Sequence, residues 1–164
     1  MQLPAILDIE ASGFGRGSYP IEVGFCAANG ALFCALVSPE PDWQHWDASA
    51  EALHGISREL LKRHGRPVRW MAEQLNARLG GQTVYCDGWG QDYTWLSRLF
   101  DAACLPQHFK LDDLRLLLNE AEALRWRGVV DTVRQRQRLS RHRASSDARV
   151  LQMALGEIKN GVTA

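Results

Sequence analysis

Two acidic residues break the apolar pattern near the start of the sequence. Asp8 lies within the apolar run 3–9, which predicts a buried strand, and Glu10 follows directly after it. Because side chains alternate along a strand, both carboxylates project from the same face. Two like charges on a partly covered face repel each other and lose hydration unless a cation compensates them. The pair therefore indicates a cation site, and the alternative is that the strand has ended and both acids are solvated.

Asp92 and Asp147 supply two further oxygen donors, each near the start of a predicted helix. The helix dipole also favours an acid there, so either residue taken alone is explained as a capping residue. Together with Asp8 and Glu10 they form the set of hard oxygen donors that magnesium prefers. Two such ions, about 3.5 to 4 Å apart, stabilise the attacking and leaving oxygens of an in-line phosphoryl displacement.

His142, five residues before Asp147, is the candidate proton acceptor for that reaction. An imidazole with an ordinary pKa near about 6.5 is largely neutral at working pH and can act as a general base. On a loop just before the helix it would reach the attacking water while Asp147 faces the ions. The alternative is a solvated histidine in a basic loop.

Strands and helices alternate along the rest of the chain. Residues 21–39 predict two strands joined at Asn29-Gly30, and 82–87 and 106–113 predict two more. Helices are predicted at the end of 40–55 and over 57–65, 67–79, 92–103, 114–126 and 146–159, the last capped by Ser145, with a helix and then a loop in 125–143. This order predicts an α/β domain in which helices flank a mixed sheet, with three antiparallel N-terminal strands followed by parallel strands.

Composition narrows the class of protein. The chain is 46% hydrophobic and 23% charged, which is typical of a globular domain. No apolar run approaches the roughly 20 residues of a membrane helix, and no secretory signal is visible, so we expect a cytoplasmic protein without membrane association. The four cysteines have no zinc-ligand spacing, which favours reduced thiols.

Charge is unevenly distributed although the net charge is zero. Residues 1–60 contain eight acidic and two basic side chains, whereas residues 122–149 contain eight arginines and three acids. Such asymmetry can create a local surface that attracts anions. A solvated, arginine-rich helix face explains the same pattern equally well.

The motifs around these residues resemble those of the DEDDh (DnaQ-like) 3′–5′ exonucleases, which have a ribonuclease-H-like fold. Asp8–Gly13 reads Asp-Ile-Glu-Ala-Ser-Gly and matches the first family motif; Phe14 and the strand segment Ile21–Gly24 follow it as in the family. His142–Ala148 matches the third motif in full, and Leu53–Ser57 resembles the His-Gly-Ile segment of the family. The matches span nearly the whole chain and imply a single exonuclease domain over residues 1–164.

The second family motif is reduced to its final acid. The family pattern His-Asn-x-x-Phe-Asp corresponds here to Asp87-Gly-Trp-Gly-Gln-Asp92, so Asp87 competes with Asp92 for the metal role. The apolar helix predicted directly after Asp92 favours that residue. Asp87 would then contact a water or the substrate.

The resemblance implies an enzyme that releases nucleoside monophosphates from single-stranded or frayed 3′ ends of DNA or RNA. Four acids would hold two Mg²⁺ or Mn²⁺ ions, and His142 would deprotonate the attacking water; the acids are Asp8, Glu10, Asp92 and Asp147. Four other residues would contact the 3′-terminal nucleotide: Ser12, Gly13, Phe14 and His54. Trp43 and Trp89 are candidate base-stacking platforms, and the arginines of 125–143 would follow the phosphates.

Other functions remain open at this point. One is a nucleic-acid-binding module with a degenerate site, although the complete acid set and His142 argue against it. Another is a different Mg²⁺-dependent nuclease on the same fold, such as an endonuclease. Small stand-alone members of the family are often dimers, so a homodimer is compatible with the resemblance, and nothing in the sequence separates DNA from RNA as substrate.

Overall fold

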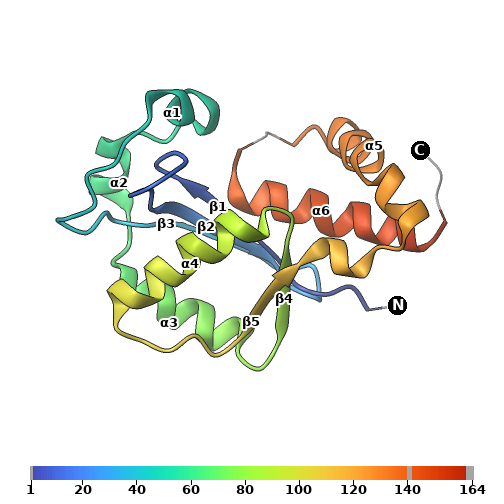
Figure 1. The fold of residues 1–164 in the computed structure, drawn as a ribbon, viewed down its shortest axis with the longest axis horizontal. Helices are drawn as coiled ribbons and strands as arrows, with labels where there is room; N and C mark the ends of the chain where they lie inside the picture. Colours follow the sequence, from blue (N-terminus) through green and yellow to red (C-terminus); the bar gives the residue numbers. More distant parts are fainter. Residues whose placement is uncertain (1, 140–141, 162–164) are drawn as a thin grey trace.

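A five-stranded sheet in the order β3-β2-β1-β4-β5 places the first strand at its centre. The computed structural model describes residues 2–139 and 142–161. The strands are β1 (Ile6–Ala11), β2 (Pro20–Cys26), β3 (Leu32–Leu36), β4 (Thr83–Cys86) and β5 (Lys110–Asp113). The first three pair antiparallel, and β4 and β5 run parallel to β1. The predicted mixed sheet is therefore confirmed (Figure 1).

Helices cover both faces of this sheet (Figure 1). The helices are α1 (Ala48–His54), α2 (Arg58–His64), α3 (Val68–Leu79), α4 (Trp89–Ala103), the 3₁₀ helix η1 (Leu114–Leu117), α5 (Glu120–Gln137) and α6 (Ala144–Lys159). Helices α3 and α4 pack with the larger hydrophobic core on one face. Helix α6 covers the other face, and α5 packs on α6.

The two faces of β1 differ in character because neighbouring side chains point in opposite directions. Leu7 and Ile9 join the core with α3 and α4. Ile6 belongs to the smaller cluster with α5 and α6, so Asp8 and Glu10 continue along that same side. In the ladder with β2, Asp8 lies opposite Gly24 and Glu10 lies opposite Glu22.

The predicted helix at 114–126 is wrong at its start. Residues Leu114–Leu117 form one 3₁₀ turn, and α5 begins only at Glu120. A capping box explains the boundary: the Asn119 side chain accepts from the amide of Glu122 at 2.9 Å, and the Glu122 carboxylate accepts from the amide of Asn119 at 2.8 Å. Helix α5 then continues to Gln137, so most of the arginine-rich segment is helical as predicted.

The predicted cap of the last helix is also wrong. Helix α6 begins at Ala144, so Ser145 lies inside its first turn and does not cap it. The carboxylate of Glu22 accepts from the amide of Ala144 at 3.0 Å and takes the place of a local cap. Helix α4 likewise begins three residues earlier than predicted, at Trp89.

Two further sequence expectations concern cysteines and membranes. All four cysteines are free thiols, with Cys26 and Cys86 buried and Cys34 and Cys104 exposed. Within 2–139 and 142–161, no helix combines the length and the apolar character needed to cross a bilayer.

Candidate active site

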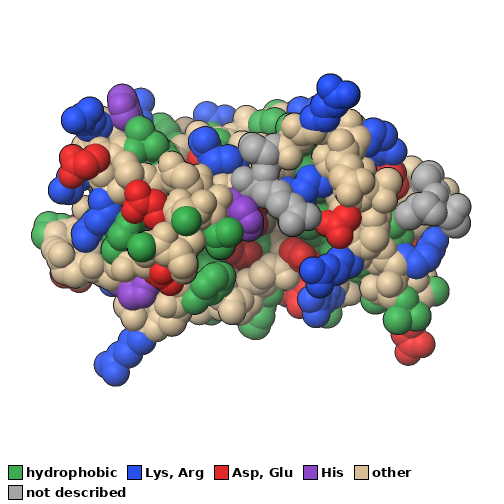
Figure 2. Space-filling model, turned by 90° about the horizontal axis from the view of Figure 1, so that it is seen from above, with side chains coloured by type: hydrophobic (Ala, Val, Ile, Leu, Met, Phe, Trp, Pro, Cys, Tyr) green, Lys and Arg blue, Asp and Glu red, His purple; other side chains and the backbone are tan. Residues whose placement is uncertain are grey.

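A cavity of about 350 Å³ opens between α1 on one side and α5 and α6 on the other. Its lining includes all five residues predicted to bind metal or act as a base: Asp8, Glu10, Asp92, His142 and Asp147. Figure 2 looks onto this opening, with acidic side chains in the central hollow, hydrophobic side chains on the α1 side and basic ones on the α5 side. The fold thus brings together residues that are up to 139 positions apart in the numbering from Asp8 to Asp147.

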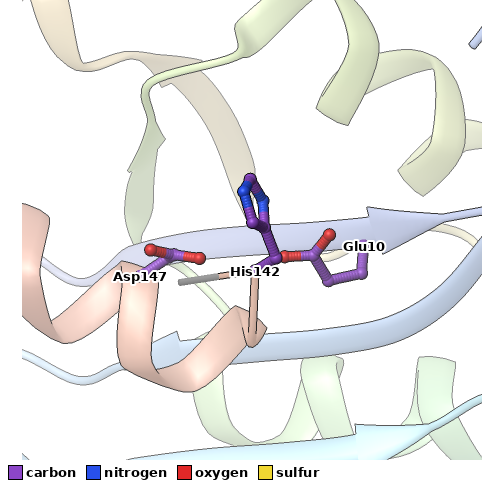
Figure 3. Close-up of side chains that lie close together, drawn as sticks. All are labelled: Glu10, His142 and Asp147. Carbon is purple, nitrogen blue, oxygen red and sulfur yellow. The ribbon is translucent and has the colours of Figure 1, made fainter. Parts of the chain in front are cut away.

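Glu10, His142 and Asp147 form the tightest group in the cavity. One potential ligand atom of each lies within 4.8 Å of the others. Figure 3 shows the imidazole of His142 between the two carboxyl groups, which come from β1 and from the first turn of α6. The backbone of His142 has φ 58°, a left-handed conformation that a non-glycine residue adopts at some cost.

Asp92 and Asp87 differ in how their oxygens are used. The Asp92 side chain is 4% exposed, and its Oδ2 has no hydrogen-bond partner among the described residues. Asp87 also lines the cavity, but its Oδ1 accepts from the indole Nε1 of Trp126 at 3.3 Å. A buried oxygen without a partner is costly unless it has a ligand, so the geometry favours Asp92 over Asp87 as a metal ligand.

Three acids of this cavity have raised pKa values: Asp8, Glu10 and Asp92. Burial, together with the charges of Asp92, Glu10, Asp147 and Glu22, raises the pKa of Asp8 well above its usual value. Burial is also the main cause that raises the pKa of Glu10 to about 7 and that of Asp92 to about 7. Such crowding of carboxylates is unfavourable without a compensating cation. The oxygen-rich donor set and the unpartnered Asp92 oxygen fit hard divalent cations such as Mg²⁺ or Mn²⁺.

Hydrogen bonds and close packing hold the N-terminus of α6 against β2, through residues whose roles were not predicted from the sequence. Arg143 donates to the buried carboxylate of Glu22 through Nε at 3.0 Å and Nη2 at 2.8 Å. A Cβ at position 24 would lie 2.4 Å from the amide nitrogen of Ser145, so only glycine admits this close approach. Glu22 and Gly24 alternate on β2, and that spacing within the Ile21–Gly24 segment was the available signal. Together they place His142 and Asp147 beside Asp8 and Glu10.

The residues predicted to contact the terminal nucleotide occupy different environments. Gly13, Phe14 and His54 line the cavity, and the Phe14 side chain is 66% exposed. Ser12 does not line it: the side chain is buried, accepts from the amide of Tyr19 at 3.1 Å, and lies 3.0 Å from Nδ1 of His45.

Local contacts hold Gly13 and His54 in place. Gly13 has φ 144°, and a Cβ there would lie 2.6 Å from Cβ of Asp47. Nδ1 of His54 accepts from the amide of Ile56 at 3.0 Å, whereas Nε2 is buried without a partner in the described part of the chain. Nε2 therefore carries the proton, and the backbone of Ala11, which also lines the cavity, interacts with this ring.

The two tryptophans predicted as stacking platforms lie in contrasting places. Trp43 is 3% exposed and stacks on Tyr19 within the core, where it cannot meet a base. Trp89 is 42% exposed and pairs with Tyr93 at a ring separation of 5.4 Å. Trp89 lies at the start of α4, next to the cavity residue Gly88.

Comparison with known proteins adds evidence on the fold. Neither a family model nor a curated protein matches the sequence. Among solved structures, the moderately thermophilic exonuclease I of Methylocaldum szegediense matches with a TM-score of 0.74 and 13% identity, covering 98% of this chain and 41% of that one. E. coli exonuclease I in complex with a dA16 oligonucleotide matches with a TM-score of 0.70 and 11% identity, covering 98% and 41%.

A third structure matches along most of its own length. The Mg²⁺- and Mn²⁺-bound form of S. pombe Pop2p has a TM-score of 0.69 and 17% identity, covering 96% of this chain and 83% of that one. The chain spans about two fifths of the exonuclease I chains. At these identities the likeness establishes the fold, and the ribonuclease-H-like mixed α/β architecture expected from the sequence is confirmed.

Proposed function

We propose that this protein is a metal-dependent 3′–5′ exonuclease that releases nucleoside monophosphates from single-stranded or frayed 3′ ends. The observation that carries the proposal is the convergence of five side chains on one cavity: Asp8, Glu10, Asp92, His142 and Asp147. They come from β1, α4, α6 and the segment just before α6, so no local sequence preference explains their meeting. A structural role for each acid separately does not account for four carboxylates around one cavity.

The four carboxylates are the residues that would hold a pair of Mg²⁺ or Mn²⁺ ions. Asp8 and Glu10 present their oxygens from one face of β1, Asp92 from the first turn of α4, and Asp147 from the first turn of α6. Bound ions would supply charge stabilisation for the attacking and leaving oxygens of the phosphodiester. The raised pKa values of Asp8, Glu10 and Asp92 fit this role, because a bound cation compensates the ionised carboxylates that burial and mutual repulsion disfavour.

His142 would accept the proton of the attacking water. Its ring lies beside Glu10 and Asp147, next to the oxygens that would hold the ions, so a water in this space is within its reach. A neutral imidazole is the form that accepts a proton, and an ordinary histidine is largely neutral above about pH 6.5. The carboxylates would hold the ions, while His142 would carry the proton.

The opposite wall suits the last nucleotide of a strand. The exposed ring of Phe14 offers an apolar surface for a base, and the buried Nε2–H of His54 offers a donor to the sugar. Gly13 lets the backbone approach closely, and Ser12 would act by fixing this loop through its hydrogen bonds to Tyr19 and His45. A cavity of about 350 Å³ has room for one terminal nucleotide.

The solved structures support the class of substrate and cofactor. Several are exonuclease I bound to single-stranded DNA oligonucleotides, and the Pop2p structure contains Mg²⁺ and Mn²⁺. Single-stranded nucleic acid is therefore the substrate to test first, with both DNA and RNA.

The test uses 5′-labelled single-stranded DNA and RNA with Mg²⁺, Mn²⁺ or EDTA. We expect a ladder that shortens from the 3′ end with either metal and no change with EDTA. A single internal product would identify an endonuclease instead. Binding of the strand without cleavage under every metal condition would identify a nucleic-acid-binding module with a degenerate site.

A further inference from the structure

Arg134 extends from α5 into the acid-lined cavity. Its side chain is 15% exposed, and its Nη1 pairs with Oδ1 of Asp147, whose own side chain is 13% exposed. Val130, one helical turn earlier on α5, lines the same cavity. Arg134 therefore lies against one of the proposed metal ligands and on the wall opposite Phe14 and His54.

One nitrogen of the Arg134 guanidinium lacks a hydrogen-bond partner in the described part of the chain. Nε of Arg134 is buried and has no hydrogen-bond partner among residues 2–139 and 142–161. A guanidinium presents its donors in fixed pairs, and Nε forms one edge with Nη2 while Nη1 faces away from that edge. An unpaired buried donor is unfavourable, so an arginine that only neutralised Asp147 would be more stable with a partner on this edge as well.

A second arginine next to the site shows what pure charge compensation looks like. Arg143 directs its Nε and Nη2 onto the carboxylate of Glu22, so its whole planar edge is paired with an acid. Arg134 contacts its acid through Nη1, and its Nε has no hydrogen-bond partner among the described residues. Both side chains are guanidinium groups, but Nε has an acidic partner in Arg143 and none among the described residues in Arg134. Of the two, Arg134 lines the cavity.

We propose that Arg134 is a substrate-binding residue whose Nε–Nη2 edge holds the non-bridging oxygens of the phosphate that joins the 3′-terminal nucleotide to the strand, while Nη1 remains on Asp147. This inference rests on the proposed function, because it assigns the phosphate of that same substrate to a named side chain. The planar edge matches two phosphate oxygens, and its charge is additional to that of the metal ions. Attachment to Asp147 places the edge beside the position where the ions would meet the phosphate.

The experiment measures binding of Mn²⁺, and then of thymidine 5′-monophosphate (dTMP), thymidine and inorganic phosphate in the presence of Mn²⁺, by calorimetry. The variants are Arg134→Gln, Arg134→Lys and, as the control, Arg63→Gln. Arg63 lies exposed on α2, outside both the cavity and the arginine-rich segment 125–143, so it tests the effect of lost charge alone. Circular dichroism melting verifies that each variant is folded, and Arg134→Lys carries the test should Arg134→Gln not fold.

We expect Arg134→Gln to weaken dTMP binding roughly tenfold to a hundredfold, with thymidine binding unchanged. Arg134→Lys should recover only part of the dTMP affinity, because it keeps the charge but lacks the planar edge. Arg63→Gln should bind dTMP within about twofold of the wild type, because this residue lies outside the proposed site. Inorganic phosphate should follow dTMP if the edge recognises phosphate alone, and should bind weakly to every variant if the attached nucleoside is required; both results support the proposal.

Two results would overturn the assignment. Equal dTMP affinity in the wild type and Arg134→Gln, with tighter Mn²⁺ binding in the variant, would make Arg134 a mere substitute for the metal charge. No dTMP binding by the wild type would also overturn it. Failure of the exonuclease proposal can be told apart from failure of this assignment. In that case the labelled strands would stay intact, while Arg134→Gln would still bind dTMP more weakly than the wild type.

Discussion

The two faces of β1 have opposite compositions although they alternate residue by residue. On one face Leu7 and Ile9 are buried in the core with α3 and α4. On the other, Ile6 is buried with α6, but the next two positions carry Asp8 and Glu10. Strand β1 is therefore covered on both faces, and the face toward α6 contains charged side chains. Stability and the proposed chemistry should therefore be separable by substitutions one residue apart.

The largest expected effect is on activity at Asp8. Asp8→Asn should lower the rate of 3′ degradation at least about 10³-fold, because a neutral amide is a poor ligand for Mg²⁺ or Mn²⁺. The melting temperature of the metal-free protein at pH 8 should not fall and should rise, because the substitution removes a carboxylate whose pKa is raised by burial. A labelled-strand assay and thermal melting measure the two quantities.

Leu7→Ala is the matched control on the opposite face. Leu7 is fully buried, so its truncation should cost about 2 to 5 kcal/mol of stability while the rate per folded molecule stays near that of the wild type. The comparison breaks down if Asp8→Asn destabilises the fold as strongly as Leu7→Ala does.

A smaller loss is expected at His142. His142→Ala should lower turnover about 10² to 10⁴-fold while Mn²⁺ affinity, measured by calorimetry, stays within about threefold of the wild type. The exposed His108, which does not line the cavity, provides the control variant His108→Ala. Loss of metal affinity in parallel with turnover would assign His142 a structural role.

The smallest expected effect is the pH dependence of stability. Glu10 and Asp92 have folded-state pKa values of about 7, above their usual values near 4, so the unfolded chain ionises them more readily. The folded protein holds these two protons more tightly than the unfolded chain does. Their contribution to the free energy of unfolding is therefore full below about pH 4 and is lost as the pH rises to about 7. Each of these two acids should cost the metal-free protein up to about 3 kcal/mol of stability between pH 5 and pH 8, since one pKa unit corresponds to about 1.4 kcal/mol.

Divalent metal should reverse this loss, because it binds the ionised carboxylates. The increase in melting temperature caused by Mn²⁺ should be larger at pH 8 than at pH 5.5. The same increase in melting temperature at pH 5.5 and pH 8 would show that Asp8 and Glu10 do not bind the ion. Asp8→Asn should reduce the difference, which connects this measurement to the first prediction.

Local sequence patterns predicted the parts of this molecule that depend on near neighbours. The period of two at Asp8 and Glu10 correctly placed both on one face, and Asn29-Gly30 correctly marked the turn between β2 and β3. Nearby information was also missed: Asn119 and Glu122 have the spacing of a capping box, yet the helix was predicted to begin at Leu114. The apolar run that starts at Leu114 favours a helix there, but the capping box at Asn119 sets the actual start of α5.

The contacts that complete the site depend on residues far apart in the sequence. The pairing of Arg143 with Glu22 joins positions 121 residues apart, and the amide of Ala144 reaches the same carboxylate. Ser145 was predicted as a cap because no local pattern reveals that Glu22 already occupies this place. The use of Arg134 on Asp147 was hidden for the same reason, since it depends on how α5 packs against α6.

The bare backbone at Gly24 also has a consequence for the order of biosynthesis. The ribosome makes Asp8 and Glu10 early, but their partners follow more than 130 residues later and must settle over Gly24. The last strand of the sheet ends at Asp113, so the sheet's own residues are all synthesised before His142 and Asp147. The proposed set of reactive groups is therefore complete only once nearly the whole chain has been made.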